Sequence, residues 1–317
     1  MREAPPDLGD ADVVTLLRDA WGLPAISAEH LPWGFGAWHW RATEAGGRRW
    51  FVTADRLWRP GRQDQLEATY GAARELFDRG LAFVVPTVPT TAGALTRHLG
   101  GYALSVTEWL EGDRPTGALT GLAAEQTMTA LAALHSEQPP SGIGVWDHAL
   151  PDRADLEGLA VTSEQEWSGG PLGAEARAQV RAHLPEIPVW IARYDTRVTV
   201  ALGTRAGWVA THGEPGLHNQ IVTAQGRRWV DWESLRVAPR ERDLTDLART
   251  AGQIPGDVVA DPELLEMFDL RWRLDEIAAF SAWLRGPHTG TESDRVALAG
   301  LLEELTRPDW LQFAGDP

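Results

Sequence analysis

The chain has 317 residues, of which 43% are hydrophobic, and this suffices for a sizeable core in one or two domains. It contains no cysteine and its 29 basic residues are all arginine, which excludes disulfides, thiolate catalysis and lysine-dependent chemistry. The net charge of −16 argues against nucleic acid or an anionic membrane as partner and is compatible with a cationic small molecule.

No targeting or membrane-spanning segment is predicted. The first residues lack the apolar stretch of a signal peptide, and no run approaches the ~18 apolar residues that cross a bilayer. We therefore expect a cytoplasmic protein, a monomer or a homodimer, that binds no nucleic acid and no membrane.

The first third of the chain predicts a small sheet with two helices. Apolar residues recur at helical spacing over 11–21 and again, in a longer helix, over 66–80. Residues 26–52 predict a hairpin and a following strand, because glycine turns separate aromatic and β-branched segments. Residues 81–88 and 102–110 are also strand-like.

A composition break at residues 111–115 precedes a mainly helical part. The predicted helices are 122–134, 174–184, 189–202, 263–283 and 294–305. One predicted hairpin, 219–222 with 228–232, interrupts them. The fold class is therefore α+β with two lobes: residues 1–110 and residues 111–317.

The segment that carries chemistry lies around this hairpin. Glu214 precedes Asn219 by five residues, and Asp231 follows Asn219 by twelve. Phosphoryl transfer needs such a set: a carboxylate that orients the attacking hydroxyl, and an amide oxygen and a carboxylate that bind Mg²⁺. The protein-kinase pattern has the same offset, with its metal-binding Asp on a hairpin.

Each residue alone has an ordinary structural explanation. Asn219 and Asp231 would be turn residues, and Asp243 a helix N-cap. His212 and His218 have no third ligand at zinc spacing, and no nucleophile-elbow motif is present. The joint spacing of Glu214, Asn219 and Asp231 favours the functional interpretation.

The run His212-Gly213-Glu214 to Asn219, followed by Val230-Asp231-Trp232, resembles the aminoglycoside phosphotransferase and choline kinase family. That family's signature is His-Gly-Asp, four residues, Asn, then Ile/Val-Asp-Trp/Phe. Residues 238–244 are similar to its spectinomycin-phosphotransferase branch, and residues 107–112 resemble its hinge. The similarity covers most of residues 24–250.

The resemblance implies a bilobal protein-kinase-like fold. Its N-terminal lobe is a small antiparallel sheet with one long helix, and its C-terminal lobe is larger and mainly helical. It also implies a Mg²⁺-dependent small-molecule kinase that moves the γ-phosphoryl group of ATP or GTP to a hydroxyl of a polar, aminoglycoside-like acceptor. Antibiotic resistance is one of the roles that such kinases serve.

The same resemblance assigns roles to residues of the catalytic segment. Glu214 takes the position of the catalytic Asp, and Asn219 and Asp231 take those of the Mg²⁺ ligands. His212 and Asp243 would brace the catalytic loop.

On the nucleotide side, the resemblance places Gly34 and Gly36 over the phosphates and the backbone of Glu108 and Leu110 at the nucleobase edge. Thr53 aligns with the strand lysine that binds the phosphates in the family. The helix glutamate that pairs with this lysine would be Glu67 or Glu75, and here it has no lysine as its partner. Arg49, on the same strand face as Thr53, and Arg41 are candidates for the missing charge.

Two departures from the family pattern leave an alternative open. Glu214 has one methylene more than Asp, which moves its oxygens by ~1 Å. The neutral hydroxyl of Thr53 cannot replace a lysine. A pseudokinase-type module that binds a nucleotide or metabolite without phosphotransfer is therefore the competing prediction.

Overall fold

The computed structural model describes residues 1–251, 254 and 258–310. The chain divides into two compact units, Met1–Val145 with Val209–Ala238 and Trp146–Trp208 with Pro239–Pro317. The lobe boundary between residues 110 and 111 stays a prediction. No helix within the described residues is long and apolar enough to cross a membrane.

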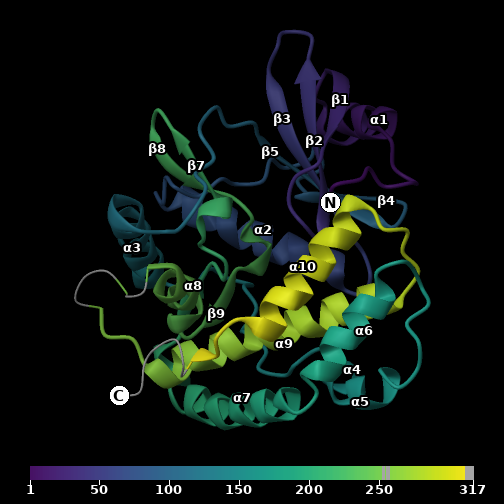
Figure 1. Ribbon diagram of the computed structural model, residues 1–317. Helices are drawn as coiled ribbons and strands as arrows, with labels where there is room; N and C mark the ends of the chain where they lie inside the picture. The colour runs from purple at the N-terminus through teal and green to yellow at the C-terminus, as the bar shows by residue number, and fades with distance from the viewer. Residues whose placement is uncertain (252–253, 255–257, 311–317) are drawn as a thin grey trace. The chain divides into compact units, whose positions relative to one another are not determined.

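The first unit contains a five-stranded antiparallel sheet with the order β1-β2-β3-β5-β4 (Figure 1). Its strands are β1 (Ala25–Leu31), β2 (Ala37–Glu44), β3 (Arg49–Arg56), β4 (Thr96–Leu99) and β5 (Tyr102–Glu108). The central strand β3 pairs with both β2 and β5, and this register sets Thr53 opposite His39 on one side and Ser105 on the other.

Helix α1 (Asp10–Trp21) covers one face of this sheet. Its buried side chains Val13, Leu17 and Trp21 share one core cluster with alternate residues of three strands. These alternate residues are Trp40 and Ala42 of β2, Trp50, Val52 and Ala54 of β3, and Tyr102, Leu104 and Val106 of β5. Because successive strand residues point to opposite faces, Phe51, Thr53 and Asp55 lie on the face away from α1.

The local sequence defines both ends of α1. Asp10 and Asp12 stand in its first turn, where negative charge favours the helix dipole, and Gly22 ends it in the left-handed conformation. Asp10 also accepts a hydrogen bond of 2.9 Å from Nε1 of the buried Trp40, which ties the helix start to the sheet.

The remaining elements of the first unit position the catalytic segment. Helix α2 (Arg62–Asp78) buries Leu66 and Tyr70 in a cluster with Leu95 and Ala103. Two short antiparallel pairs follow helix α3 (Gly121–Ser136). They are β6 (Val209–Thr211) with β9 (Arg236–Ala238), and β7 (Gln220–Thr223) with β8 (Gly226–Trp229).

The second unit is helical in its described residues. Its helices are α4 (Arg153–Glu157), α5 (Leu159–Thr162), α6 (Gly173–Ala182), α7 (Glu186–Gly203), α8 (Glu241–Ala251), α9 (Pro262–Arg285) and α10 (Glu292–Thr306). Two acids of α9, Glu266 and Asp269, do not lie on a solvated face of the helix. Both are buried, Glu266 against Arg193 and Arg197, and Asp269 against Arg249 and Arg307, because a buried carboxylate requires a paired charge.

The α+β class and the predicted helices are confirmed, but one strand was wrongly assigned. Residues 81–88 form no strand, and Val84 alone makes an isolated bridge, with Trp229. Pro86 lacks the N–H that a continuing ladder needs. Conversely, β4, β6 and β9 were not predicted, since three or four residues carry too little alternation to be recognised.

Leu104→Ala should lower the free energy of unfolding by about 2–5 kcal/mol, because Leu104 is buried in the sheet core and its truncation leaves a cavity. Ile26→Ala on β1 is the control, since Ile26 is 58% exposed and its loss should change stability by less than about 0.5 kcal/mol. Denaturant unfolding measures both, and equal effects would contradict the assignment of this core.

Candidate active site

His212 is the buried centre of the catalytic segment. Its Nδ1 accepts a hydrogen bond of 3.2 Å from the backbone N–H of Glu214, and its Nε2 donates one of 3.0 Å to the carbonyl oxygen of Val230. The rings of Trp229 and Trp232 pack edge-on against the imidazole. One side chain thus fixes the backbone beside Glu214 and the backbone just before Asp231.

Asn219 is the next fixed point. Its Nδ2 donates a hydrogen bond of 3.0 Å to the carbonyl oxygen of Glu214, while its own carbonyl accepts from the N–H of Val230 at 3.0 Å. None of the described residues donates a hydrogen bond to Asn219 Oδ1. The amide is therefore oriented through its nitrogen and keeps its oxygen available.

Asp231 follows β8 in an unusual backbone conformation. It has φ 65° and ψ 57°, and no other non-glycine residue of the described ranges has a positive φ. The left-handed conformation is energetically unfavourable for a residue with a side chain, and residues that adopt it cluster at functional sites. Asp231 is exposed, and its carboxylate accepts no hydrogen bond from any described residue.

The charges around Asp231 are mostly negative. Although Asp231 is accessible to solvent, the closeness of surrounding protein raises its pKa well above the usual value, and the charges of Glu233, Glu214 and Asp55 raise it further. Arg62 is the opposing charge that lowers this pKa. Glu214, Asn219 and Asp231 are thus brought together as the sequence predicts, in surroundings that favour a bound cation.

The donor set suits a hard divalent cation. Asn219 Oδ1 and the Asp231 carboxylate are oxygen ligands, which Mg²⁺ prefers. Within the described residues, no three His, Asp or Glu side chains converge as a complete metal site. A cation here would need further oxygens from a phosphate or from water, and this is how Mg²⁺ is usually held in phosphoryl-transfer sites.

A buried ion-pair network adjoins Asp231. Arg62 Nη2 lies 3.7 Å from Asp55 Oδ1 and also pairs with Glu233, while the hydroxyl of Tyr70 donates to Asp55 Oδ2 at 3.3 Å. Burial, followed by the charge of Glu233, raises the pKa of Asp55 well above its usual value. No spacing rule pointed to this network, because Glu233 lies 171 positions from Arg62 in the sequence.

The position of the missing lysine has different chemistry. Thr53 Oγ1 forms a hydrogen bond of 3.2 Å with Nδ1 of the facing His39. Neither acid expected on α2 faces it: Glu67 accepts from the backbone N–H groups of Leu95 and Thr96, and Glu75 pairs with Arg79.

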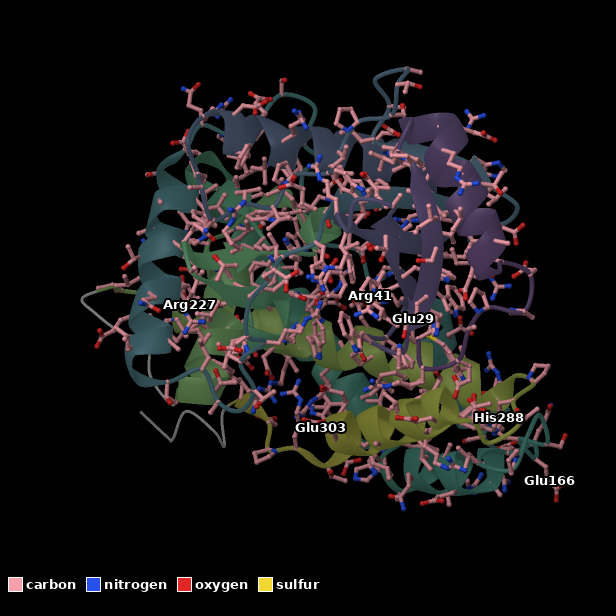
Figure 2. All side chains as sticks on the ribbon, turned by 90° about the horizontal axis from the view of Figure 1, so that it is seen from above. Glu29, Arg41, Glu166, Arg227, His288 and Glu303 are labelled. Atoms are coloured by element: carbon pink, nitrogen blue, oxygen red, sulfur yellow. The ribbon has the colours of Figure 1, made fainter. Side chains whose placement is uncertain are left out.

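The two arginines proposed for this role are already paired. Arg49 pairs with Glu111, and Arg41 lies 2.5 Å from Glu29 of the neighbouring strand (Figure 2). Both guanidinium groups lie over the ring of Trp109.

An aromatic cluster not recognised from the sequence lies on the same sheet face. Phe51, two residues before Thr53, stacks with Trp33 at 6.3 Å between ring centres, and both rings approach Trp109. All three are partly exposed. The alternation of Phe51 with Thr53 along β3 was the available signal.

The hinge and the glycine turn flank this cluster. Glu108 ends β5, and its carboxylate pairs with Arg48. The backbone N–H and C=O of Leu110 form no hydrogen bond with the described residues. Gly34 and Gly36 form the β1–β2 turn with φ of 67° and 95°, conformations that glycine adopts without strain.

A model of the phosphotransferase enzyme family, APH, matches residues 28–283. The chain belongs to this family. It is also 27% identical over 281 residues to Protein StrN of Streptomyces griseus, which covers 83% of this chain and 85% of StrN.

Solved structures show that this family member has the protein-kinase-like fold of its relatives. Spectinomycin phosphotransferase APH(9)-Ia, in complex with ADP and spectinomycin, superposes with a TM-score of 0.77 over 98% of both chains, at 16% identity. Amicoumacin kinase hAmiN, in complex with AMP-PNP, Ca²⁺ and Ami, gives 0.59 over 96% of this chain and 95% of its own, at 11% identity.

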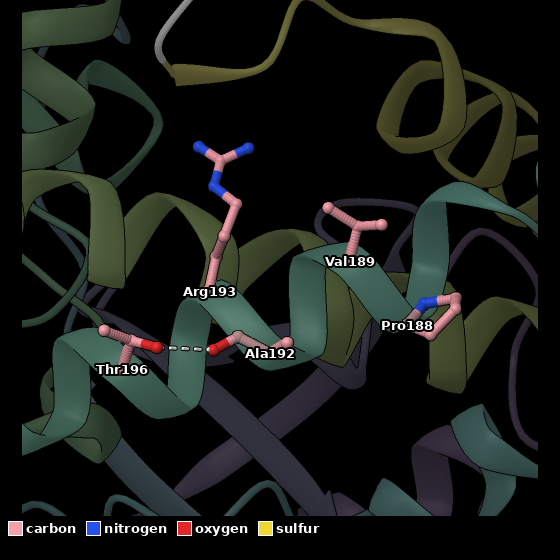
Figure 3. A pocket seen from close by; sticks show the side chains of 5 residues that line it. All are labelled: Pro188, Val189, Ala192, Arg193 and Thr196. Carbon is pink, nitrogen blue, oxygen red and sulfur yellow. Dashed lines mark hydrogen bonds between the residues drawn. The ribbon is translucent and has the colours of Figure 1, made fainter.

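Two further features belong to the second unit. Asp243 is fully buried in the first turn of α8, so it is not an N-cap, and its bracing role stays a prediction. A surface hollow of about 430 Å³ lies along α7 at Pro188, Val189, Ala192, Arg193 and Thr196 (Figure 3). It offers no carboxylate or carboxamide to a phosphate-bound metal.

His39 makes a pH dependence testable. Burial, with nearby positive charge that includes Arg114, lowers its pKa from 6.5 to about 3. As the pH falls, His39 is therefore protonated in the unfolded chain before it is protonated in the folded chain. The contribution of neutral His39 to stability is fully present above pH 6.5 and is lost as the pH falls toward 3. At pH 5 this should cost wild type about 1–2 kcal/mol relative to pH 7, and His39→Gln should lack this loss. Parallel pH profiles of unfolding for both proteins would contradict it.

Proposed function

We propose that this phosphotransferase moves the γ-phosphoryl group of ATP or GTP to a hydroxyl of a small polar molecule, with Mg²⁺ bound by Asn219 and Asp231. One observation carries the proposal: Asn219 Oδ1 and the Asp231 carboxylate lie at one end of a hairpin beside Glu214, and neither accepts a hydrogen bond from the described residues. Membership of the family supports kinase-type chemistry.

When bound, Mg²⁺ supplies positive charge that offsets the negative charge on the phosphate oxygens. The chain's own contribution is a rigid set of ligands. Asn219 is oriented by its bond to Glu214, and Asp231 is held by the backbone contact between His212 and Val230. Fixed groups of this kind stabilise a transition state without reorganising during the reaction.

Glu214 is the residue proposed to orient the acceptor. A bond forms between the acceptor oxygen and the γ-phosphorus, while the bond from that phosphorus to the oxygen shared with the β-phosphate breaks. The proton of the acceptor hydroxyl passes to the Glu214 carboxylate as the bond forms. Both backbone groups of Glu214 are hydrogen-bonded, so its side chain starts from a fixed point.

The proposed nucleotide site lies on the sheet face that carries Thr53. The backbone groups of Leu110 are suited to the edge of a nucleobase, and the partly exposed rings of Trp33, Phe51 and Trp109 offer it flat apolar surface. Gly34 and Gly36 would let backbone approach the phosphates closely.

The proposed acceptor is an amino-bearing, aminoglycoside-like molecule. Structural relatives are named for spectinomycin and amicoumacin, and the net charge of −16 favours a cationic ligand. We keep a role in antibiotic resistance, and a cytoplasmic location, as expectations.

One observation favours a second candidate, a binding module without phosphotransfer. Thr53 stands where the family has its lysine, and its hydroxyl is bonded to His39 rather than to a cation. A shift of the unfolding temperature by Mg-ATP, without ATP consumption over a broad panel of hydroxyl acceptors, would favour the module.

Asp231→Asn should abolish phosphotransfer, with at least a ~100-fold lower rate, because it removes the only negatively charged ligand of the proposed Mg²⁺ pair. The apo protein should be no less stable than wild type, since a repelled carboxylate is removed. A coupled assay of nucleotide hydrolysis and transfer measures the rate, with the exposed Asp78→Asn as control. Full activity of Asp231→Asn would refute the metal assignment.

Glu214→Gln should lower kcat by about 10²–10⁴-fold, because the amide cannot accept the acceptor's proton. Its nucleotide Kd should stay within about twofold of wild type. Glu214→Asp, which keeps the carboxylate, is the matched variant and should retain measurable activity. A glutamine variant as fast as wild type would remove Glu214 from the mechanism.

A further inference from the structure

The chain has no cation at the position of the family lysine, and its neighbours do not supply one. Arg41 and Arg49 lie near the hinge end of the sheet, where Glu29 and Glu111 neutralise them. A phosphate-binding cation has to come from elsewhere in the first unit.

Arg62 is the cation that the structure places beside Asp231. It is the first residue of α2, its side chain is 12% exposed, and its charge acts directly on Asp231. Its Nη2 pairs with Asp55 of β3 and with Glu233, two residues after Asp231. One guanidinium group therefore ties together the central strand, helix α2 and the turn that carries Asp231.

Part of this guanidinium group remains unused. Arg62 Nε is buried without an acceptor, and Nη1 forms no hydrogen bond with the described residues. Nη1 is not among the buried unpartnered atoms, so it keeps access to solvent. Arginine carries five N–H donors in a rigid fork, and can hold a carboxylate on one side while it binds a phosphate on another.

We propose that Arg62 is the phosphate-binding cation of this chain, supplied by helix α2 instead of strand β3. In the family, the strand carries the lysine and the helix carries its partner acid. Here the charges are exchanged, because the acid Asp55 stands on the strand, two residues after Thr53, and the base Arg62 stands on the helix. The Nη1 N–H groups donate to a phosphate oxygen of the nucleotide, while Nη2 stays on Asp55 and Glu233. This assignment rests on the nucleotide binding proposed above.

The anchoring carboxylates make Arg62 suited to this role. A free arginine loses side-chain entropy when it binds, whereas the two carboxylates already hold this one in place. Arg114 is the alternative cation: its guanidinium lies 3.9 Å from the ring centre of Trp33, and no carboxylate among the described residues pairs with it. Arg62 is favoured because it pairs with Glu233, two residues after Asp231, where the phosphate-bound metal is proposed.

The test compares a ligand with phosphates and one without, by isothermal titration calorimetry of ADP with Mg²⁺ and of adenosine. Arg62→Gln should raise the Kd of ADP at least tenfold and leave that of adenosine within about twofold. Arg62→Lys should recover part of the loss. Thr53→Lys in the Arg62→Gln background should recover more, because it restores a cation on the strand. Arg59→Gln, just before α2, is the control, since the side chain of Arg59 contacts only Gln65 and the exposed Trp58 in the described structure.

Three results would overturn the proposal: an unchanged ADP affinity in Arg62→Gln, an equal loss for ADP and adenosine, or a larger ADP-specific loss in Arg114→Gln. A wild-type chain that binds no ADP would overturn both this inference and the proposed function. Arg62-dependent ADP binding without phosphotransfer to any acceptor would contradict the proposed function and support this inference.

Discussion

Two of the groups proposed for chemistry, Glu214 and Asp231, have their backbone fixed by one buried imidazole. His212 reaches the N–H of Glu214 with one ring nitrogen and the carbonyl of Val230 with the other, and so joins two segments that the β7–β8 hairpin separates. A neutral imidazole has one donor and one acceptor, and both are used here. No apolar side chain could replace it, because two buried backbone groups would then lose their partners.

The contacts of His212 stabilise the turn in which Asp231 adopts its left-handed conformation. A left-handed backbone and a carboxylate surrounded by other acids are both unfavourable in isolation. The hydrogen bond to Val230 and the packing of Trp232 against His212 hold the turn in spite of both. A cation at Asp231 would remove the repulsion between these carboxylates. The loss of this unfavourable interaction would then contribute to the affinity for the metal.

The sequence predicts what depends on local pattern. The helices, the hairpin and the set Glu214, Asn219 and Asp231 follow from periodicity and spacing, and the structure brings the three residues together. Contacts between distant segments leave no such trace: Asp55, Arg62 and Glu233 meet although the last two are 171 positions apart. For the same reason, the partners of Glu67, the backbone N–H groups of Leu95 and Thr96, could not be derived from its place on α2.

Thr53 in place of the family lysine and Glu214 in place of the family aspartate both affect one distance. It is the distance between the catalytic carboxylate and the reacting phosphate. In the proposed site, Arg62 would attract the phosphates toward the Asp231 turn, whereas a lysine at position 53 would attract them toward the strand face. Glu214 has one methylene more than the family's Asp and so reaches farther from its own anchored backbone. A shifted phosphate and a longer catalytic side chain are compatible changes, because in-line transfer depends on their separation rather than on the position of either group. The missing lysine and the exchanged carboxylate therefore both bear on the geometry of one proposed site.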